Sequence, residues 1–219
     1  MSTQQFSFSP ASNADSSGAH NQSKSYFEKQ TDQEIWRLFV DGDNKAFIYL
    51  YDKYFITLFR YGCQLTADKE LIKDVIQDIF IDFRVKKYNV SSTTSIRFYL
   101  LRCFKNNLIN KLKKNNRYLI IGENIENFDF TFSLSQEQIL IDRQLKDETI
   151  KKLNEALKKL TNRQREAMYY LFYQNFSIDQ IQKMMQMENR RSVQNLIYKT
   201  ISILKDQIVL IVTYLFYPI

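Results

Sequence analysis

The sequence contains little glycine, proline, cysteine or histidine, and each shortage excludes a kind of fold or site. Only 4 glycines and 2 prolines occur in 219 residues, which leaves few positions for tight turns and favours long helices. With 2 cysteines and 1 histidine, the chain lacks the parts of a zinc site, a Cys-His pair or a Ser-His-Asp triad. A glycine-rich phosphate loop is also missing. The sequence therefore predicts an all-α protein without catalytic residues, metal or cofactor, and we do not expect an enzyme.

Long apolar segments are scarce as well. Residues 1–25 have no apolar core of the kind that a signal peptide needs, and the apolar segment Ile208 to Ile219 is shorter than the roughly twenty residues of a membrane span. The isolated thiols of Cys63 and Cys103 fit a reducing cytosol better than a disulfide framework. We therefore expect a cytoplasmic protein without membrane contact, in which residues 208–219 end a helix that packs against protein.

Positive charge is concentrated in one stretch. The chain has 31 Lys and Arg against 24 Asp and Glu, a formal net charge of +7, yet residues 84–117 contain no acidic residue. The bases of this stretch are Arg84, Lys86, Lys87, Arg97, Arg102, Lys105, Lys111, Lys113, Lys114 and Arg117. Aromatic and amide side chains lie between them, which is typical of a nucleic-acid surface. A solvated cationic helix face is the alternative, and the exclusion of acid over this length argues against it.

Composition divides the chain into four parts. Residues 1–25 are mostly small and polar, and they predict a disordered tail because they cannot repay the entropy of ordering. Residues 26–117 and 146–219 show helical periodicity and predict two small helical domains. Residues 118–145 are acidic and lose this periodicity, which predicts a flexible linker.

The first domain shows helical patterns over residues 44–62 and 66–85 and again from Ser95 onward. Thr31 and Asp32 offer an N-cap for a short helix before them, with Glu34 in its first turn, and Ser95 can cap the third long helix. That third helix would bury Leu101, Phe104, Leu108 and Leu112 and would place Arg102, Lys105, Asn106 and Asn110 mostly on the opposite side. The sequence thus predicts one basic, solvent-facing side for this helix.

The polar side of segment 66–85 is acidic. Asp74, Asp78 and Asp82 lie four residues apart and therefore stack on one helix face. Like charges at this spacing destabilise an isolated helix by roughly a few tenths of a kcal/mol per pair. Because the three aspartates are present in spite of this repulsion, they suggest that the helix face binds a basic partner. The alternative is that the face is simply exposed to solvent.

The second domain ends in a helix-turn-helix pattern. Asn162, Ser177 and Ser192 predict the starts of three successive helices, of which the second is short and the last is long. Arg191, Gln194, Asn195 and Tyr198 share one exposed face of the last helix, and these residue types are suited to a DNA major groove. A plain helical hairpin is the alternative.

Together these segments resemble a bacterial RNA polymerase sigma factor of the extracytoplasmic-function (ECF) type in the sigma-70 family. The resemblance covers roughly Asp43 to Gln207. Similarity to the family's second domain is carried by AFIYLYDKYFITLFRYG, DKELIKDVIQDIFIDF and FYLLRCFKNNLINKLKK. The family's fourth domain is similar to the segment LNEALKKLTNRQREAMYYLFYQNFSIDQIQKMM. The segment SVQNLIYK resembles the variant that is common among Bacteroidetes members of the family. Gln186 stands where the commoner family form has a glycine that opens the turn.

The resemblance implies roles for individual residues. Asp74, Gln77 and Asp78 match the helix that binds the clamp helices of the polymerase largest subunit. The helix from Phe98 resembles the one that engages the minus-ten element, and the loop before it resembles the one that captures a flipped base. The residues implied to contact the minus-ten element are Lys86, Lys87, Tyr88, Asn89, Arg97, Arg102, Lys105 and Asn106. Minus-thirty-five contacts are implied for Arg163, Arg165, Arg191, Ser192, Gln194, Asn195, Tyr198 and Lys199. The implied partners are core RNA polymerase, through its clamp helices and flap, promoter DNA and an anti-sigma factor, with no small-molecule substrate.

Two other functions fit the residues. A conventional helix-turn-helix regulator would bind a palindromic duplex site without polymerase, but its N-terminal sensor domain would have no reason to be so basic. An anti-sigma-like adaptor would bind only proteins, and its function would not depend on Arg102, Lys105 or Lys111.

Overall fold

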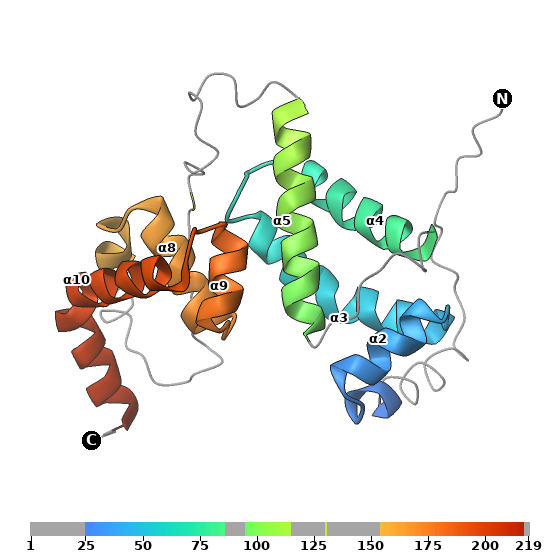
Figure 1. The fold of residues 1–219 in the computed structure, drawn as a ribbon, viewed down its shortest axis with the longest axis horizontal. Coiled ribbons are helices and arrows are strands. Elements are labelled where there is room, and N and C mark those ends of the chain that lie inside the picture. Colours follow the sequence, from blue (N-terminus) through green and yellow to red (C-terminus); the bar gives the residue numbers. More distant parts are fainter. Residues whose placement is uncertain (1–24, 86–94, 115–129, 131–153, 217–219) are drawn as a thin grey trace.

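The computed structural model describes residues 25–85, 95–114, 130 and 154–216, with side chains described as far as residue 205. Within these ranges the regular elements are helices and no strand occurs (Figure 1). The prediction of an all-α protein is confirmed. The predicted disordered tail up to residue 24 and most of the predicted linker lie outside the described residues.

Four helices form what we call the first helix group: α2 (Asp32–Val40), α3 (Asn44–Gly62), α4 (Lys69–Val85) and α5 (Ile96–Lys114). Helix α3 packs against both α4 and α5, and α4 packs against α5. Helix α2 closes the group by contacting α3 and α5. The acidic and the basic segments of the sequence therefore lie on two neighbouring helices.

Polar side chains fix the helix starts in the first helix group. Of the two predicted caps for α2, Thr31 is the N-cap and forms a capping box with Glu34, whereas Asp32 is the first residue of the helix. Asp43 accepts hydrogen bonds from the first backbone N–H groups of α3. The backbone N–H of Ile96, at the start of α5, donates to Asp32 Oδ2 at 3.0 Å. Since Asp32 belongs to α2, this bond also ties the first helix to the start of the basic helix.

Gly62 allows α3 to approach its two neighbours closely. A Cβ atom built on Gly62 would lie 2.7 Å from Ile72 Cγ2 and 2.9 Å from Phe104 Cζ. Both neighbours are fully buried and belong to α4 and α5. The missing side chain is therefore required for the three long helices to meet at this point.

The second helix group consists of α8 (Asn162–Met168), the short π-helix η2 (Tyr169–Tyr173), α9 (Ile178–Met185) and α10 (Arg190–Phe216). Helix α10 packs against α8 and α9, and η2 continues α8 and contacts α9. Figure 1 shows α5 at the centre of the molecule, with α4 on one side and α9 on the other. Helix α5 thus faces the second helix group, and so does the end of α3, where Tyr61 contacts Tyr170.

Two of the three helix starts predicted for this region are displaced. Ser177 caps α9 with a capping box, as predicted. Helix α8 is capped by Thr161 and not by Asn162. The predicted cap at Ser192 is also wrong, because Asn189 Oδ1 accepts the backbone N–H of Ser192 at 2.8 Å within a helix that has already begun. In both cases a second residue with a capping side chain lies close by, and the sequence alone does not choose between them.

The turn between α9 and α10 opens with a left-handed residue. Gln186 has φ 51° and ψ 40°, and its backbone N–H donates to the carbonyl oxygen of Gln182. Glycine adopts this conformation without the steric cost that a Cβ atom adds. This geometry fits the expectation that glycine is the commoner residue at this position.

One hydrophobic core runs through both helix groups, from Leu58 and Phe104 in the first to Tyr170 in the second. A smaller cluster belongs to the second helix group and the residues just before it, and contains Ala156, Leu157, Leu160, Met168 and Leu204. Phe130 is the one described residue of the predicted linker. It is 1% exposed, and its ring centroid lies 5.4 Å from that of Tyr169. At least this position of the linker is therefore held in the core.

Helix α10 is long and continues into the apolar C-terminal segment. It runs from Arg190 to Phe216, and the side chains beyond residue 205 lie outside the description. Among the described residues, no helix has both the length and the apolar character required to cross a membrane.

Candidate nucleic-acid interface

The outward side of α4 carries the acidic residues predicted to bind a protein partner. Asp74, Gln77 and Asp78 are exposed, whereas Val75 on the other side of the helix is buried. Asp78 is not free of intramolecular contacts, because Lys111 Nζ of α5 lies 2.5 Å from its Oδ2 atom. A partner that binds this face must therefore compete with Lys111 for Asp78.

Two exposed apolar residues continue this acidic face, and sequence reasoning missed them. Ile81 is 59% exposed and Val85 is 74% exposed. They follow Gln77 by four and eight residues and so lie on the same side of α4. The sequence did contain a signal for their exposure. Ile81 lies two residues before the buried Phe83 and Val85 lies two residues after it, so both point away from the buried side of α4. Apolar anchors with charged residues beside them are typical of protein-docking surfaces. We call Asp74, Gln77, Asp78, Ile81 and Val85 the α4 face.

The basic side of α5 is only partly open to solvent. Arg97, Arg102 and Asn106 are exposed, as expected for residues that contact nucleic acid. Lys105 is only 7% exposed, so the expectation that it faces solvent is wrong. The other residues implied to contact the minus-ten element, Lys86, Lys87, Tyr88 and Asn89, lie outside the described residues.

Lys105 is buried because its ammonium group binds the second helix group. Its Nζ atom lies 2.6 Å from Glu166 Oε1 and donates to the carbonyl oxygen of Met184 at 2.9 Å. The carboxylate of Glu166 is also mostly covered, with 13% of its side chain exposed. Glu166 belongs to α8 and Met184 to α9, so one lysine of α5 holds two elements of the second helix group.

Two buried tyrosines extend this contact. The hydroxyl of Tyr170 donates to Glu166 Oε1 at 2.7 Å, and the hydroxyls of Tyr170 and Tyr61 lie 2.5 Å apart. Because the single hydroxyl proton of Tyr170 is given to Glu166, Tyr61 must donate to Tyr170. Burial raises the pKa of both phenols well above their usual range, so both remain neutral donors. We call Lys105, Glu166, Tyr170 and Tyr61 the Lys105 network.

The residues predicted to read bases lie on the open side of α10. Arg191, Asn195, Tyr198 and Lys199 are exposed, and Gln194 is half-buried. Arg190 Nη1 lies 3.2 Å from both carboxylate oxygens of Asp179, which connects the start of α10 to α9. Ser192 donates its hydroxyl proton to Asn189 Oδ1 at 3.0 Å, so this proton is used inside the turn. The structure thus presents most of this predicted set on one surface.

Two arginines of α8 were predicted to contact phosphate. Arg163 and Arg165 are both half-buried. The guanidinium of Arg165 donates to Asn162 Oδ1 within the same helix. These side chains are therefore less open to a ligand than the exposed residues of α10.

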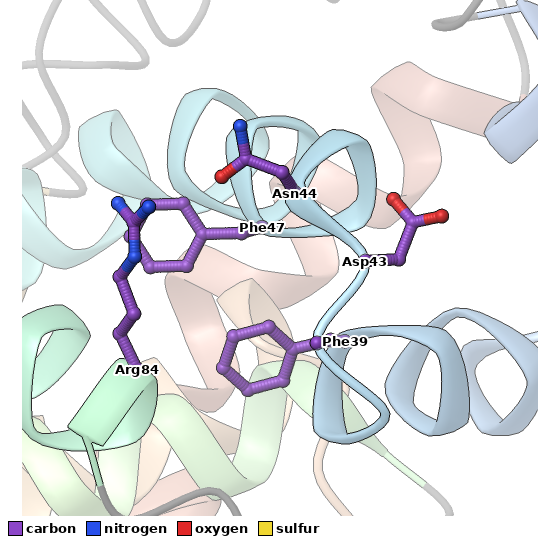
Figure 2. A pocket seen from close by; sticks show the side chains of 6 residues that line it. Phe39, Asp43, Asn44, Phe47 and Arg84 are labelled. Carbon is purple, nitrogen blue, oxygen red and sulfur yellow. The ribbon is translucent and has the colours of Figure 1, made fainter.

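A small pocket lies where α2 meets α3 (Figure 2). Its volume is about 150 Å³, and Phe39, Phe47 and Arg84 contribute to its lining. Figure 2 shows the guanidinium of Arg84 beside the ring of Phe47, 5.3 Å from the ring centroid, with the Asp43 carboxylate pointing away. That carboxylate caps α3, so it is not free to act as a base. In the described part of the chain, His, Cys, Asp and Glu form no group of three or more that could hold a metal ion.

In the described structure an acid-free basic helix, α5, therefore lies beside the exposed acidic and apolar α4 face. Residues 50–118 match the family model of sigma-70 region 2. The matched segment contains most of α3 and all of α4 and α5, and so includes both surfaces. The match supports a sigma factor of the sigma-70 family, with roles in promoter recognition and RNA polymerase binding. A comparison with curated proteins found no match.

Proposed function

We propose that this protein is a sigma factor of the ECF type, a dissociable subunit that directs core RNA polymerase to promoters and helps to melt them. The observation that carries the proposal is the position of the α4 face next to the basic helix α5, inside the segment that matches sigma-70 region 2. Docking and DNA binding on adjacent helices allow one small module to hold polymerase and promoter together. The protein would supply specificity in the cytoplasm and no enzymatic activity of its own.

The α4 face would bind the clamp helices of the polymerase largest subunit. Asp74 and Gln77 offer exposed polar groups, and Ile81 offers an apolar surface that gains free energy when it is covered. Exposed charge pairs alone contribute little to affinity. The apolar residues would therefore supply much of the binding energy, and the carboxylates would supply orientation.

Helix α5 and the segment before it would engage the minus-ten element. Arg97, Arg102 and Asn106 are exposed on α5 and are suited to the phosphates and base edges of a separated strand. The preceding segment, which contains Tyr88 and Asn89, would hold a flipped base. Unpairing a base costs about a few kcal/mol, and stacking and phosphate contacts would offset that cost.

The second helix group would read the minus-thirty-five element as a helix-turn-helix, with α10 in the major groove. Its support is geometric: short α9, a tight turn and long α10, with Arg191, Asn195 and Tyr198 exposed on α10. The same group would contact the polymerase flap. We further propose that an anti-sigma factor regulates the protein by covering surfaces that polymerase needs.

The test is capture of the purified protein on core RNA polymerase, followed by transcription in vitro from a promoter library and sequencing of the transcript starts. The proposal expects stoichiometric binding to core enzyme and transcripts that begin downstream of paired minus-thirty-five and minus-ten motifs. Absence of core binding together with an unchanged transcript set would reject it. Tight binding to a palindromic duplex without polymerase would instead support the conventional regulator.

A further inference from the structure

The pocket of about 150 Å³ between α2 and α3 has no role in the proposed function (Figure 2). Its apolar wall contains Phe39, which is 3% exposed, and Phe47, and the two rings stack with their centroids 6.1 Å apart. Gly42 lines the pocket at the turn between the helices, and its φ of 94° lies in the left-handed region that favours glycine. This turn brings the end of α2 against the first turn of α3, so both rings line one cavity.

The guanidinium of Arg84 supplies the positive charge of the pocket. Arg84 is exposed near the end of α4, and its guanidinium lies 5.3 Å from the centroid of the Phe47 ring. Among the described residues, no carboxylate forms an ion pair with it. Asp43 also lines the pocket, but its carboxylate points away in Figure 2 and accepts the backbone N–H groups of Lys45 and Ala46 at 2.7 and 2.9 Å. The charge of Arg84 is therefore available to a ligand.

The size and the lining of the pocket define the class of ligand. An apolar protein cavity of about 150 Å³ binds benzene, so this volume suits one six-membered ring with a small substituent. An aromatic ring would pack against Phe39 and Phe47 by stacking or edge-to-face contacts. A carboxylate on that ring would accept two parallel N–H bonds from the planar guanidinium of Arg84. The side-chain amide of Asn44, which also lines the pocket, can donate a further hydrogen bond.

We propose that this pocket binds a small aromatic carboxylic acid of the size of benzoate, with its ring against Phe39 and Phe47 and its carboxylate on Arg84. The site goes beyond the proposed function, and it can be tested on the free protein. A ligand of about nine non-hydrogen atoms should bind weakly, with a Kd of roughly 0.1–1 mM. Because Arg84 directly precedes Val85, a bound acid would offset a positive charge at the end of the α4 face.

The alternative occupant is a base of a separated DNA strand. Bases stack on aromatic rings, and Arg84 opens the acid-free segment 84–117. A base, however, offers only neutral acceptors to the guanidinium, whereas a carboxylate forms charge-assisted bonds that are about twice as strong. The charged side chain without a described carboxylate partner therefore favours the acid.

The test is an NMR titration of the isotope-labelled protein with sodium benzoate, in which the backbone amide signals of Gly42 and Asn44 report on the pocket. Both signals should shift saturably with benzoate. Sodium acetate at the same concentration should leave them unchanged, because it carries the charge without the ring. Benzamide carries the ring without the charge and should bind about tenfold more weakly than benzoate, a ratio that corresponds to about 1.4 kcal/mol.

The role of Arg84 is tested by substitution. Arg84→Gln should weaken benzoate binding about tenfold, again about 1.4 kcal/mol. Arg84→Lys keeps the charge but loses the planar pair of donors, so it should cause a smaller loss, and it serves as the test if Arg84→Gln fails to fold by circular dichroism. Arg37→Gln is the matched control, because it removes an exposed guanidinium of α2 that does not line the pocket and should leave benzoate binding unchanged.

The absence of saturable shifts at Gly42 and Asn44 would overturn the proposal, and so would equal binding of benzoate by the wild-type protein and by the Arg84 variants. Equal affinity for benzamide and benzoate would reject the acid as the ligand class. Shifts with thymidine and none with benzoate would assign the pocket to a DNA base instead. Failure of the proposed function has a different signature, namely no core binding and no transcripts while benzoate still binds the free protein.

Discussion

Gln186 occupies a backbone conformation that costs free energy for any residue with a Cβ atom. Its φ of 51° places it in the left-handed region at the end of α9. Replacement by glycine should remove a steric cost of about 1 kcal/mol, partly offset by the greater chain entropy of glycine when unfolded. Gln186→Gly should therefore raise the urea midpoint of unfolding.

The control for this prediction is Lys183→Gly, three residues earlier in the exposed part of α9. Lys183 has helical backbone geometry, so glycine there should lower stability by about 0.5–1 kcal/mol. If both variants lost stability equally, the left-handed residue would carry no strain.

Gly62→Ala should destabilise the protein although alanine is the better helix former. Helix propensity favours alanine by about 1 kcal/mol, so a site with free space would gain stability. At Gly62 the new Cβ would lie 2.7 Å from Ile72 Cγ2, and overpacking of this kind typically costs about 1–3 kcal/mol. A net loss in chemical denaturation, measured by circular dichroism, is the expected result. A net gain would show that α3 can move away from α4 and α5 without penalty.

At the scale of single elements, the α4 face can be tested for docking. Ile81→Ser should weaken binding to core polymerase about tenfold, or about 1.4 kcal/mol, and Asp74→Ala should weaken it by a smaller factor. Both should spare the fold because both side chains are exposed. Asp78 is less informative, since its loss also breaks the ion pair with Lys111. Titration of fluorescently labelled protein with core enzyme gives the affinities.

Glu70→Ala is the matched control for these variants. Glu70 lies on the same helix and is exposed, but its carboxylate pairs with Lys73 at 2.8 Å near the start of α4. Such exposed pairs contribute about 0–1 kcal/mol, so the variant should keep its stability and its affinity for polymerase. A loss of affinity for Glu70→Ala equal to that for Asp74→Ala, with no loss for Ile81→Ser, would mean that α4 binds by general charge and not through the α4 face.

Helices α5 and α10 are expected to contact DNA in different ways. Arg102→Ala should weaken promoter binding by the polymerase complex similarly for all sequences and reduce the salt dependence by roughly one counterion, as for a phosphate contact. Asn195→Ala should change preference at one base position by about 1–3 kcal/mol. Binding of a promoter library at two salt concentrations separates the effects, and a uniform loss for Asn195→Ala would make it a phosphate contact.

Local sequence patterns were sufficient for the helical fold and for most exposed residues. The spacing of apolar residues identifies the long helices and the outward side of α4, because a helix repeats its faces every three to four residues. The start of α8 at Thr161 was less predictable, since neighbouring Asn162 has a similar capping ability. Ile81 was missed because the outward side of α4 was assigned from its polar residues alone, although Ile81 does not belong to the buried stripe.

The contact between the two helix groups could not be predicted from such patterns. Lys105 and Glu166 are 61 residues apart, and Tyr61 and Tyr170 are 109 apart. Periodicity places Lys105 on the buried side of α5, four residues after Leu101 and three before Leu108, so its assignment to the solvent-facing side misjudged the local pattern. A lysine stem is long enough to pack against apolar neighbours while its ammonium group finds a distant carboxylate. The local pattern was thus sufficient to indicate that Lys105 is covered, whereas its partners Glu166 and Met184 are set by tertiary packing.

At the scale of the whole molecule, the shared core makes stability depend on phenols in both helix groups. Burial raises the pKa of Tyr61, Tyr170, Tyr54 and Tyr169 above the usual value. In the unfolded chain these phenols ionise near pH 10, whereas in the folded protein they stay protonated at higher pH. Their contribution to stability is therefore complete below about pH 10 and declines as the pH rises further, toward the folded pKa values.

The free energy of unfolding should thus fall steeply above about pH 10, by up to about 1.4 kcal/mol per pH unit for each such phenol. The double variant Tyr61→Phe with Tyr170→Phe should be less stable at neutral pH, because the buried carboxylate of Glu166 loses the hydrogen bond that Tyr170 donates. Its slope above pH 10 should nevertheless be shallower by the contribution of two phenols. Tyr26→Phe removes an exposed phenol and should leave the slope unchanged. Urea unfolding between pH 9 and 11 measures all three proteins, and equal slopes would show that the tyrosines between the two helix groups are accessible to solvent.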